Sequence, residues 1–128
     1  MIEDELRDLL APNTDIPVFA RYLPPELPQC YCIQEIGGRT SNANLRRAVH
    51  FISVMACASR LEEARVRLNY ARDFYTTQIP LRDNGTVTTI NQHHYYTAVP
   101  MAEGKIIQKA ARGPVFILHA IMEVTRQL

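Results

Sequence analysis

The residues best suited to chemistry are two adjacent histidines, His93 and His94. Imidazole nitrogens bind metal ions and exchange protons near neutral pH. Neighbouring residues of a strand point to opposite faces, so this pair cannot hold one ion without a bulge. His50 and His119 also fall in strand-like stretches, and the sequence contains no His-x-x-x-His zinc motif. The pattern therefore favours half-exposed strand histidines over a metal site.

Three cysteines, Cys30, Cys32 and Cys57, are a second possible source of chemistry. On a strand, Cys30 and Cys32 place two sulfurs on one face. Structural zinc sites, however, prefer two to four residues between cysteines and need a second ligand pair, which is missing here. An odd count also argues against a disulfide framework. We expect three small buried hydrophobic residues in a reducing compartment.

Residues 37–42, Gly-Gly-Arg-Thr-Ser-Asn, resemble a phosphate-binding loop only at first sight. A P-loop requires a Gly-Lys-Ser/Thr ending between a strand and a helix. Here the segment joins two expected strands, and no Lys follows. The sequence predicts a mobile hairpin tip, with a docking finger as the alternative because the tip carries Arg39 and small polar side chains.

Catalytic groups are not recognisable in the remaining residues. No Ser/His/Asp or Cys/His arrangement can be identified, and paired carboxylates are limited to Glu62 and Glu63. Tyr95 and Tyr96 lack surrounding basic residues, so packing or an interface is favoured over base stacking, with one ring in the core and one exposed. We therefore expect a protein that is not an enzyme and that needs no cofactor or metal.

Composition describes an ordinary globular chain. The 128 residues are enough for one domain, taken as 1–128, and the apolar fraction of 47% is typical of globular proteins. No apolar run is long enough to span a membrane, and the acidic start, MIEDELRDLL, is unlike a secretory signal. The formal net charge of +1 is too balanced for a general nucleic-acid binder.

The first half of the chain is expected to begin with a helix over 2–10, whose apolar residues recur on one face and which ends before Pro12. Residues 16–20 suit an edge strand, and the proline-rich residues 23–28 form a stiff connector. Further expected elements are a strand over 29–36, a polar loop over 39–44, a strand over 45–58 and a helix over 59–76. Ser59 and Glu62 match a capping box at the start of that helix.

The second half is expected to be mostly strand. A turn at 83–85 precedes a long strand over 86–99, and residues 101–113 are expected to form an extended loop. Residues 115–125 favour a strand over a helix because of their β-branched residues and the preceding Gly-Pro. The predicted class is α+β: a mostly antiparallel sheet of about five strands, one long helix packed across it, and a short N-terminal helix.

This order of elements resembles the small tail-terminator and tail-to-head joining proteins of long-tailed bacteriophages, often labelled minor capsid or tail completion proteins. The features that carry the resemblance are the N-terminal amphipathic helix, Ile16-Pro17-Val18-Phe19, the proline-rich connector, the strand ending in Gly37-Gly38, the strand over 47–58, the helix over 59–76 and two closing strands.

The resemblance implies a structural virion protein, made in the host cytoplasm, that forms a ring, commonly a hexamer, at the head-proximal end of the tail. Such a ring stops tube polymerisation and presents a surface to the head connector. Its partners would be copies of itself, the tail tube protein and the head-completion protein. Genomic DNA would pass through its lumen without sequence-specific binding, and neither a membrane nor an organic cofactor would be involved.

Loops and charge suggest where such contacts would form. Residues 1–8 carry four acids against one Arg, whereas residues 37–72 carry seven Arg against two Glu. These regions could complement each other between neighbouring copies in a head-to-tail contact. The residues expected at subunit or axial interfaces are Arg39, Thr40, Asn42, Arg46, Arg65, Arg67, Glu103, Lys105, Lys109 and Arg112.

Three other interpretations stay open. A head–tail stopper or adaptor would also form a ring but would bind the portal side. A small α+β ligand-binding or enzymatic domain would need a pocket, and His93, His119 and Tyr95 would be its best candidates. The third is a dimeric regulatory module.

Overall fold

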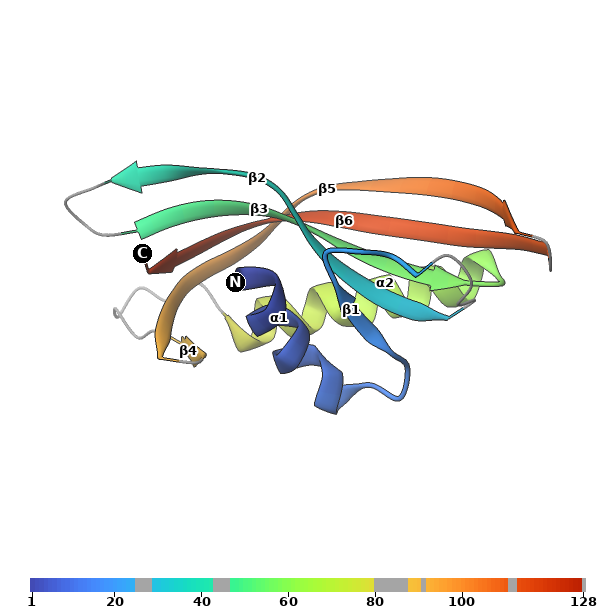
Figure 1. The fold of residues 1–128 in the computed structure, drawn as a ribbon, viewed down its shortest axis with the longest axis horizontal. Helices are drawn as coiled ribbons and strands as arrows, with labels where there is room; N and C mark the ends of the chain where they lie inside the picture. The colour runs from blue at the N-terminus through green and yellow to red at the C-terminus, as the bar shows by residue number, and fades with distance from the viewer. Residues whose placement is uncertain (25–28, 43–46, 80–87, 91, 111–112, 128) are drawn as a thin grey trace.

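The computed structural model describes residues 1–24, 29–42, 47–79, 88–90, 92–110 and 113–127. Within them one six-stranded sheet has the order β1-β2-β3-β6-β5-β4, and two helices lie against one of its faces (Figure 1). The elements are α1 (Ile2–Leu10), the short 3₁₀ helix η1 (Ala11–Asn13), β1 (Val18–Ala20), β2 (Cys30–Asn42), β3 (Arg47–Ala58), α2 (Leu61–Gln78), β4 (Thr88–Ile90), β5 (His93–Ala110) and β6 (Gly113–Gln127).

The α+β class is confirmed, with differences in its details. Neighbouring strands are antiparallel except for β1 and β2, which run parallel at one edge. The long helix α2 runs along the length of the sheet rather than across it, and α1 shares the same face (Figure 1). The sheet therefore has a helix-covered face and an opposite face that neither helix covers.

The core lies between the helices and the covered face of the sheet. The spacing of Ile2, Leu6 and Leu10 buries one side of α1, as the apolar stripe predicts. The buried residues of α2 form the stripe Ala64, Leu68, Ala71 and Tyr75. They face alternate residues of β3, among them Ile52 and Val54, in a single hydrophobic cluster. Small alanines in α2 let the helix approach the sheet closely.

The start of α2 differs from the predicted capping box. The residue at the N-cap position is Arg60, whose backbone is extended, and no side chain caps the helix. Ser59 therefore lies one residue too early for its hydroxyl to reach the first free amides. At the other end the helix continues to Gln78, and the Ile79 N–H donates to the Tyr75 carbonyl.

Two predicted loops are strands. Residues 37–42 continue β2, and residues 101–110 continue β5, because each is paired residue by residue with the next strand of its hairpin. Regular ladder bonds thus outweigh the weak strand propensity of these polar stretches. Pro100, expected to end a strand, lies at a bulge of β5, where a missing N–H is tolerated.

The expected long strand over 86–99 is divided. Residues 88–90 form β4, and β5 starts at His93, with Gln92 between them at a left-handed φ of 69°. The predicted turn at 83–85 lies outside the described residues. The strand preferred for 115–125 is confirmed by β6, which pairs with β3 on one side and β5 on the other.

Candidate interaction surface

One end of the sheet extends past both helices (Figure 1). We call residues 37–42 of β2 and 47–51 of β3 the β2–β3 arm. A bulge between Glu35 and Gly37 marks its base, and bulges bend a strand and change its direction. A Cβ atom on Gly38 would lie 2.8 Å from the Val49 carbonyl oxygen, so the glycine permits close approach of β2 to β3. The predicted tip is therefore a continued hairpin as far as Asn42.

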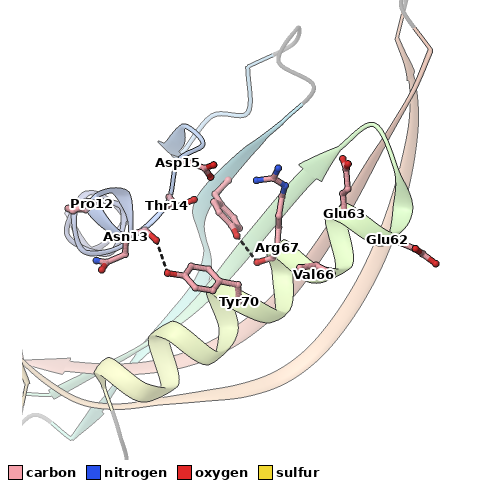
Figure 2. Close-up of a pocket in the computed structure, with 10 residues that line it drawn as sticks. Pro12, Asn13, Thr14, Asp15, Glu62, Glu63, Val66, Arg67 and Tyr70 are labelled. Carbon is pink, nitrogen blue, oxygen red and sulfur yellow. Dashed lines mark hydrogen bonds between the residues drawn. The ribbon is translucent and has the colours of Figure 1, made fainter.

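A groove lies between the turn after η1 and the first half of α2 (Figure 2). Its volume is 880 Å³, and it is lined by Pro12, Asn13, Thr14, Asp15, Tyr31, Glu62, Glu63, Val66, Arg67 and Tyr70. Two hydroxyls fix its walls: Tyr70 donates to the Asn13 carbonyl at 2.6 Å, and Tyr31 donates to the Arg67 carbonyl at 2.7 Å. These bonds tie α2 to η1 and to β2, and so fix the walls of the groove relative to one another.

The groove combines apolar surface with excess negative charge. Val66 is 68% exposed and Tyr70 45% exposed, although both are large hydrophobic side chains. Asp15 and Glu63 contribute carboxylates, whereas the Glu62 carboxylate points away from the groove (Figure 2). The Glu63 Oε2 atom is buried with no hydrogen-bond partner among the described residues. A chain segment that carries both a cation and apolar side chains would complement this surface.

Arg67, the cation that lines the groove, already has a hydrogen-bond partner within the chain. The Arg67 Nη2 atom donates to Gln29 Oε1 at 2.9 Å, which ties α2 to the start of β2. Burial raises the pKa of Tyr31 to about 12, so its hydroxyl stays a donor at neutral pH. Arg67 was predicted at an interface, and the structure places it in the groove wall, with its guanidinium bound within the chain.

The other predicted interface residues are scattered. Arg39, Thr40 and Asn42 lie in β2, and Lys105 and Lys109 lie in β5, all in strands rather than in the predicted loops. Arg65 is an exposed residue of α2. Arg46 and Arg112 lie outside the described residues.

Glu103 has a partner within the chain. It forms an ion pair with Arg72 and so joins β5 to α2. The predicted interface residue is thus part of the contact between the helix and the sheet.

The acidic side chains of the N-terminal helix have partners within the chain. Glu3 accepts the Glu35 backbone N–H at 3.1 Å, and Asp4 accepts a 2.8 Å bond from Arg21. The Arg21 bond lowers the pKa of Asp4 below its usual range. Glu5 is also buried and bonded. Asp8 in turn accepts from Arg7 Nε at 3.0 Å, so all four carboxylates of the predicted head-to-tail contact have partners within the chain.

Glu5 is the centre of a buried polar cluster beneath α1. Its Oε1 accepts from the Tyr95 hydroxyl at 2.7 Å, and its Oε2 accepts from Arg126 Nη1 at 2.9 Å. His93 Nδ1 lies 3.1 Å from the same Oε2 atom. The carboxylate is 5% exposed, and its partners come from the ends of β5 and β6. The cluster therefore fastens α1 to the sheet.

The structure does not bring together the three residues proposed for a ligand-binding or enzymatic pocket, His93, Tyr95 and His119. His93 and Tyr95 meet at Glu5, but His119 packs against Gly104, seven residues from Arg126 along β6. That separation is about 23 Å at ~3.3 Å per residue. His94 instead lies 3.0 Å from the Thr89 hydroxyl, so the adjacent histidines have different partners, as their alternation predicts.

No metal site is found in the described part of the chain. Within it no three His, Cys, Asp or Glu side chains gather as metal ligands would. Cys30 and Cys57 pack with Ile117 on the sheet face away from the helices. All three cysteines are buried and reduced, and burial raises the pKa of Cys32 to about 11. The prediction of small buried hydrophobic residues is confirmed for all three.

Sequence reasoning missed the groove. A usable signal was present, because Val66 and Tyr70 are four residues apart and lie off the buried stripe of α2. Residues at this spacing are neighbours on a helix surface. The turn that faces them comes from residues 12–15, far away in sequence, so only the fold brings the two walls together.

Tyr96, the second ring of the tyrosine pair, is half-buried with Arg47 stacked 3.9 Å from its centre.

The comparisons with known proteins bear on the fold. No family model matches the chain, and no curated protein matches it. A chain in the solved virion of a native gene transfer agent particle has a similar structure, with a TM-score of 0.57 over 94% of this chain and 84% of that chain. The sequences are 10% identical, so the similarity establishes a shared fold.

Neither helix in the described residues is long and apolar enough to cross a bilayer.

Proposed function

We propose that this protein is a structural component of a virion, and more specifically a tail terminator. Copies would form a ring, commonly a hexamer, at the head-proximal end of a phage tail. The ring would end the tail tube and join it to the head connector. The observation that carries the proposal is the similarity to a chain of the gene transfer agent virion, which extends over nearly the whole of both chains.

A role without catalysis is part of the proposal. Its support is that the polar groups most suited to chemistry are used in packing. The Tyr95 hydroxyl and Arg126 bond to Glu5, and the hydroxyls beside the groove bond to backbone carbonyls. Such bonds stabilise contacts between elements, which a subunit of an assembly requires.

The shape of the chain suits a ring subunit. The sheet is long and curved, and its two ends extend beyond the helical layer (Figure 1). A subunit of this kind has separate surfaces for its neighbours and for the parts above and below it. Its proposed partners are copies of itself, the tail tube protein and a head-completion protein, with DNA passing through the lumen. It would be made in the host cytoplasm and incorporated into the virion.

The test is to image the protein on tail tubes. Purified protein would be mixed with tubes assembled from tail tube protein and, separately, with DNA-filled heads that lack tails. We expect ring density at one end of the tubes and an arrest of further tube growth. Binding to heads only would support a stopper or adaptor instead. Binding to neither, with unaltered tube growth, would contradict a role in the tail.

A further inference from the structure

We propose that Cys30 and Cys57 form a disulfide between β2 and β3 when the protein leaves a reducing compartment, and that this bond links the two strands covalently. The site is separate from the groove and from the Glu5 cluster. The proposal rests on the proposed function in one respect, because a virion protein is made in the reducing host cytoplasm and then carried out of it. The bond itself can be tested on the purified chain.

The register of the sheet places the two cysteines directly opposite each other. Cys30 is the Cα partner of Cys57 in the antiparallel β2–β3 pair. Opposite residues of such a pair have Cα atoms about 4.5–5.5 Å apart, and a disulfide spans about 4.4–6.8 Å between Cα atoms. Both side chains pack with Ile117 in one buried cluster. The bond can therefore form without a change of strand register.

Cys32 is the competing thiol, and its position is less favourable. It lies opposite Met55, which leaves it diagonal to Cys57 at about 7–8 Å. Along β2 it is two residues from Cys30, about 6.6 Å at ~3.3 Å per residue. Parallel side chains keep their Cβ atoms about as far apart, whereas a disulfide needs about 3.5–4.5 Å between them. The geometry therefore selects Cys30 and Cys57 and leaves Cys32 as a free thiol.

The two thiols differ in acidity, which assigns their order of reaction. A hydrogen bond from the Cys57 thiol lowers the pKa of Cys30 below its usual value and raises the pKa of Cys57. Because the thiolate is the reactive form of cysteine, Cys30 is the attacking group and Cys57 the resolving one.

A small organic disulfide would serve as the oxidant. The Cys30 sulfur attacks one sulfur of the oxidant, whose S–S bond breaks and releases one thiol. The Cys57 sulfur then loses its proton and attacks the Cys30 sulfur, which releases the second thiol. The protein loses two electrons and two protons, and these reduce the oxidant to two thiols.

Access to the pair is controlled by a small part of the fold. Cys30 is 0% exposed and Cys57 1% exposed, and the side chains packed against their cluster include Phe19 and Leu23. Phe19 belongs to β1, an edge strand of three residues. Short elements at the edge of a structure open at lower free energy than core strands. We therefore expect opening of this segment to admit the oxidant, whereas the second step joins two sulfurs that are already neighbours.

The test maps the disulfide in the full chain. Reduced protein would be incubated with hydroxyethyl disulfide at mildly alkaline pH, its free thiols blocked with N-ethylmaleimide in denaturant, and its peptides identified by mass spectrometry. We expect one bond per chain, between Cys30 and Cys57, and one blocked thiol, at Cys32. Cys32→Ala should keep the bond, and Cys57→Ala should leave two blocked thiols. Leu23→Ala, which removes part of the covering side chains, should form the same bond about 10-fold faster.

A second measurement asks whether the bond fits the native fold. Closing the loop over residues 30–57 should lower the equilibrium constant for unfolding about 30–1,000-fold, measured by urea denaturation with and without a reductant. Cys32→Ala should show the same difference between its two redox states, and Cys57→Ala should show none.

Three results would overturn the proposal: bonds that involve Cys32, three free thiols in both the parent chain and Leu23→Ala, or an oxidised chain less stable than the reduced one. Particles and host cytosol treated with N-ethylmaleimide separate the proposal from the proposed function. We expect the bond in chains from particles and free thiols in chains from cytosol. Chains in particles with free thiols would support the virion role and overturn the proposal. A bond in the purified chain, with no chain in particles, would support the disulfide site and contradict the virion role.

Discussion

The buried Glu5 cluster allows a quantitative prediction. Replacing Glu5 with Ala removes the acceptor of the Tyr95 hydroxyl and of Arg126 Nη1. The carboxylate is 5% exposed and Arg126 16% exposed, so water cannot readily replace the lost partner. Breaking a buried ion pair by removing one member costs about 3–5 kcal/mol. His93 is 42% exposed and adds little, because exposed pairs contribute about 0–1 kcal/mol.

We expect Glu5→Ala to lower the free energy of unfolding by about 3–5 kcal/mol, a large part of the total of about 5–15 kcal/mol for a domain. Urea denaturation followed by circular dichroism would measure it. Asp8→Ala, in the same helix but 58% exposed, is the matched control and should change stability by less than about 0.5 kcal/mol.

A double-mutant cycle tests the cause of that loss. If the cluster acts as one unit, Glu5→Ala and Arg126→Ala together should cost less than the sum of the single changes by about 0.5–3 kcal/mol. A Glu5→Ala loss below about 1 kcal/mol, or strict additivity with Arg126→Ala, would refute the conclusion that this carboxylate fastens α1 to the sheet.

Two further predictions concern tyrosine ionisation and the base of the arm. Burial raises the pKa of Tyr31 to about 12 and also raises those of Tyr75 and Tyr95. Because the folded pKa of Tyr31 exceeds the usual 10.0, the stability that its neutral hydroxyl contributes is complete below pH 10 and is lost as pH rises through about 12. Phenolate absorbance should therefore have a late phase that coincides with unfolding; full ionisation of a still-folded chain near pH 10 would contradict this. Gly38→Ala should cost about 1–3 kcal/mol in urea denaturation, because its Cβ would meet the Val49 carbonyl at 2.8 Å. Gly37→Ala, with 3.5 Å to Phe51, should cost less, and equal losses would count against the close approach.

Local patterns predicted the elements that have a clear periodicity. The stripe of α2, the helix over 2–10 and the strands over 45–58 and 115–125 all follow from apolar spacing and residue type. Polar stretches were predicted less well. Residues 101–110 contain charges and a glycine and were expected to be loop, yet they pair with β6. Strand propensity depends on the neighbouring strand, which the local sequence does not reveal.

The candidate site was less predictable than the fold. Charge counting predicts the arginine-rich region as a possible interface and the N-terminal helix as its acidic partner. Net charge along a sequence does not indicate which carboxylates are already bonded within the chain, as Glu3, Asp4 and Glu5 are. The groove was missed because its two walls, residues 12–15 and the first half of α2, are about 50 residues apart in the sequence.

By itself, the sequence of this protein determined the fold class, the apolar faces of both helices, the burial of the three cysteines and the lack of any recognisable catalytic motif. These depend on periodicity and residue type, which are local properties. Tertiary structure alone decided which charges are used internally, where the hairpins extend and that a groove forms between residues 12–15 and α2. These depend on contacts between distant segments, and such contacts exist only once the chain has packed.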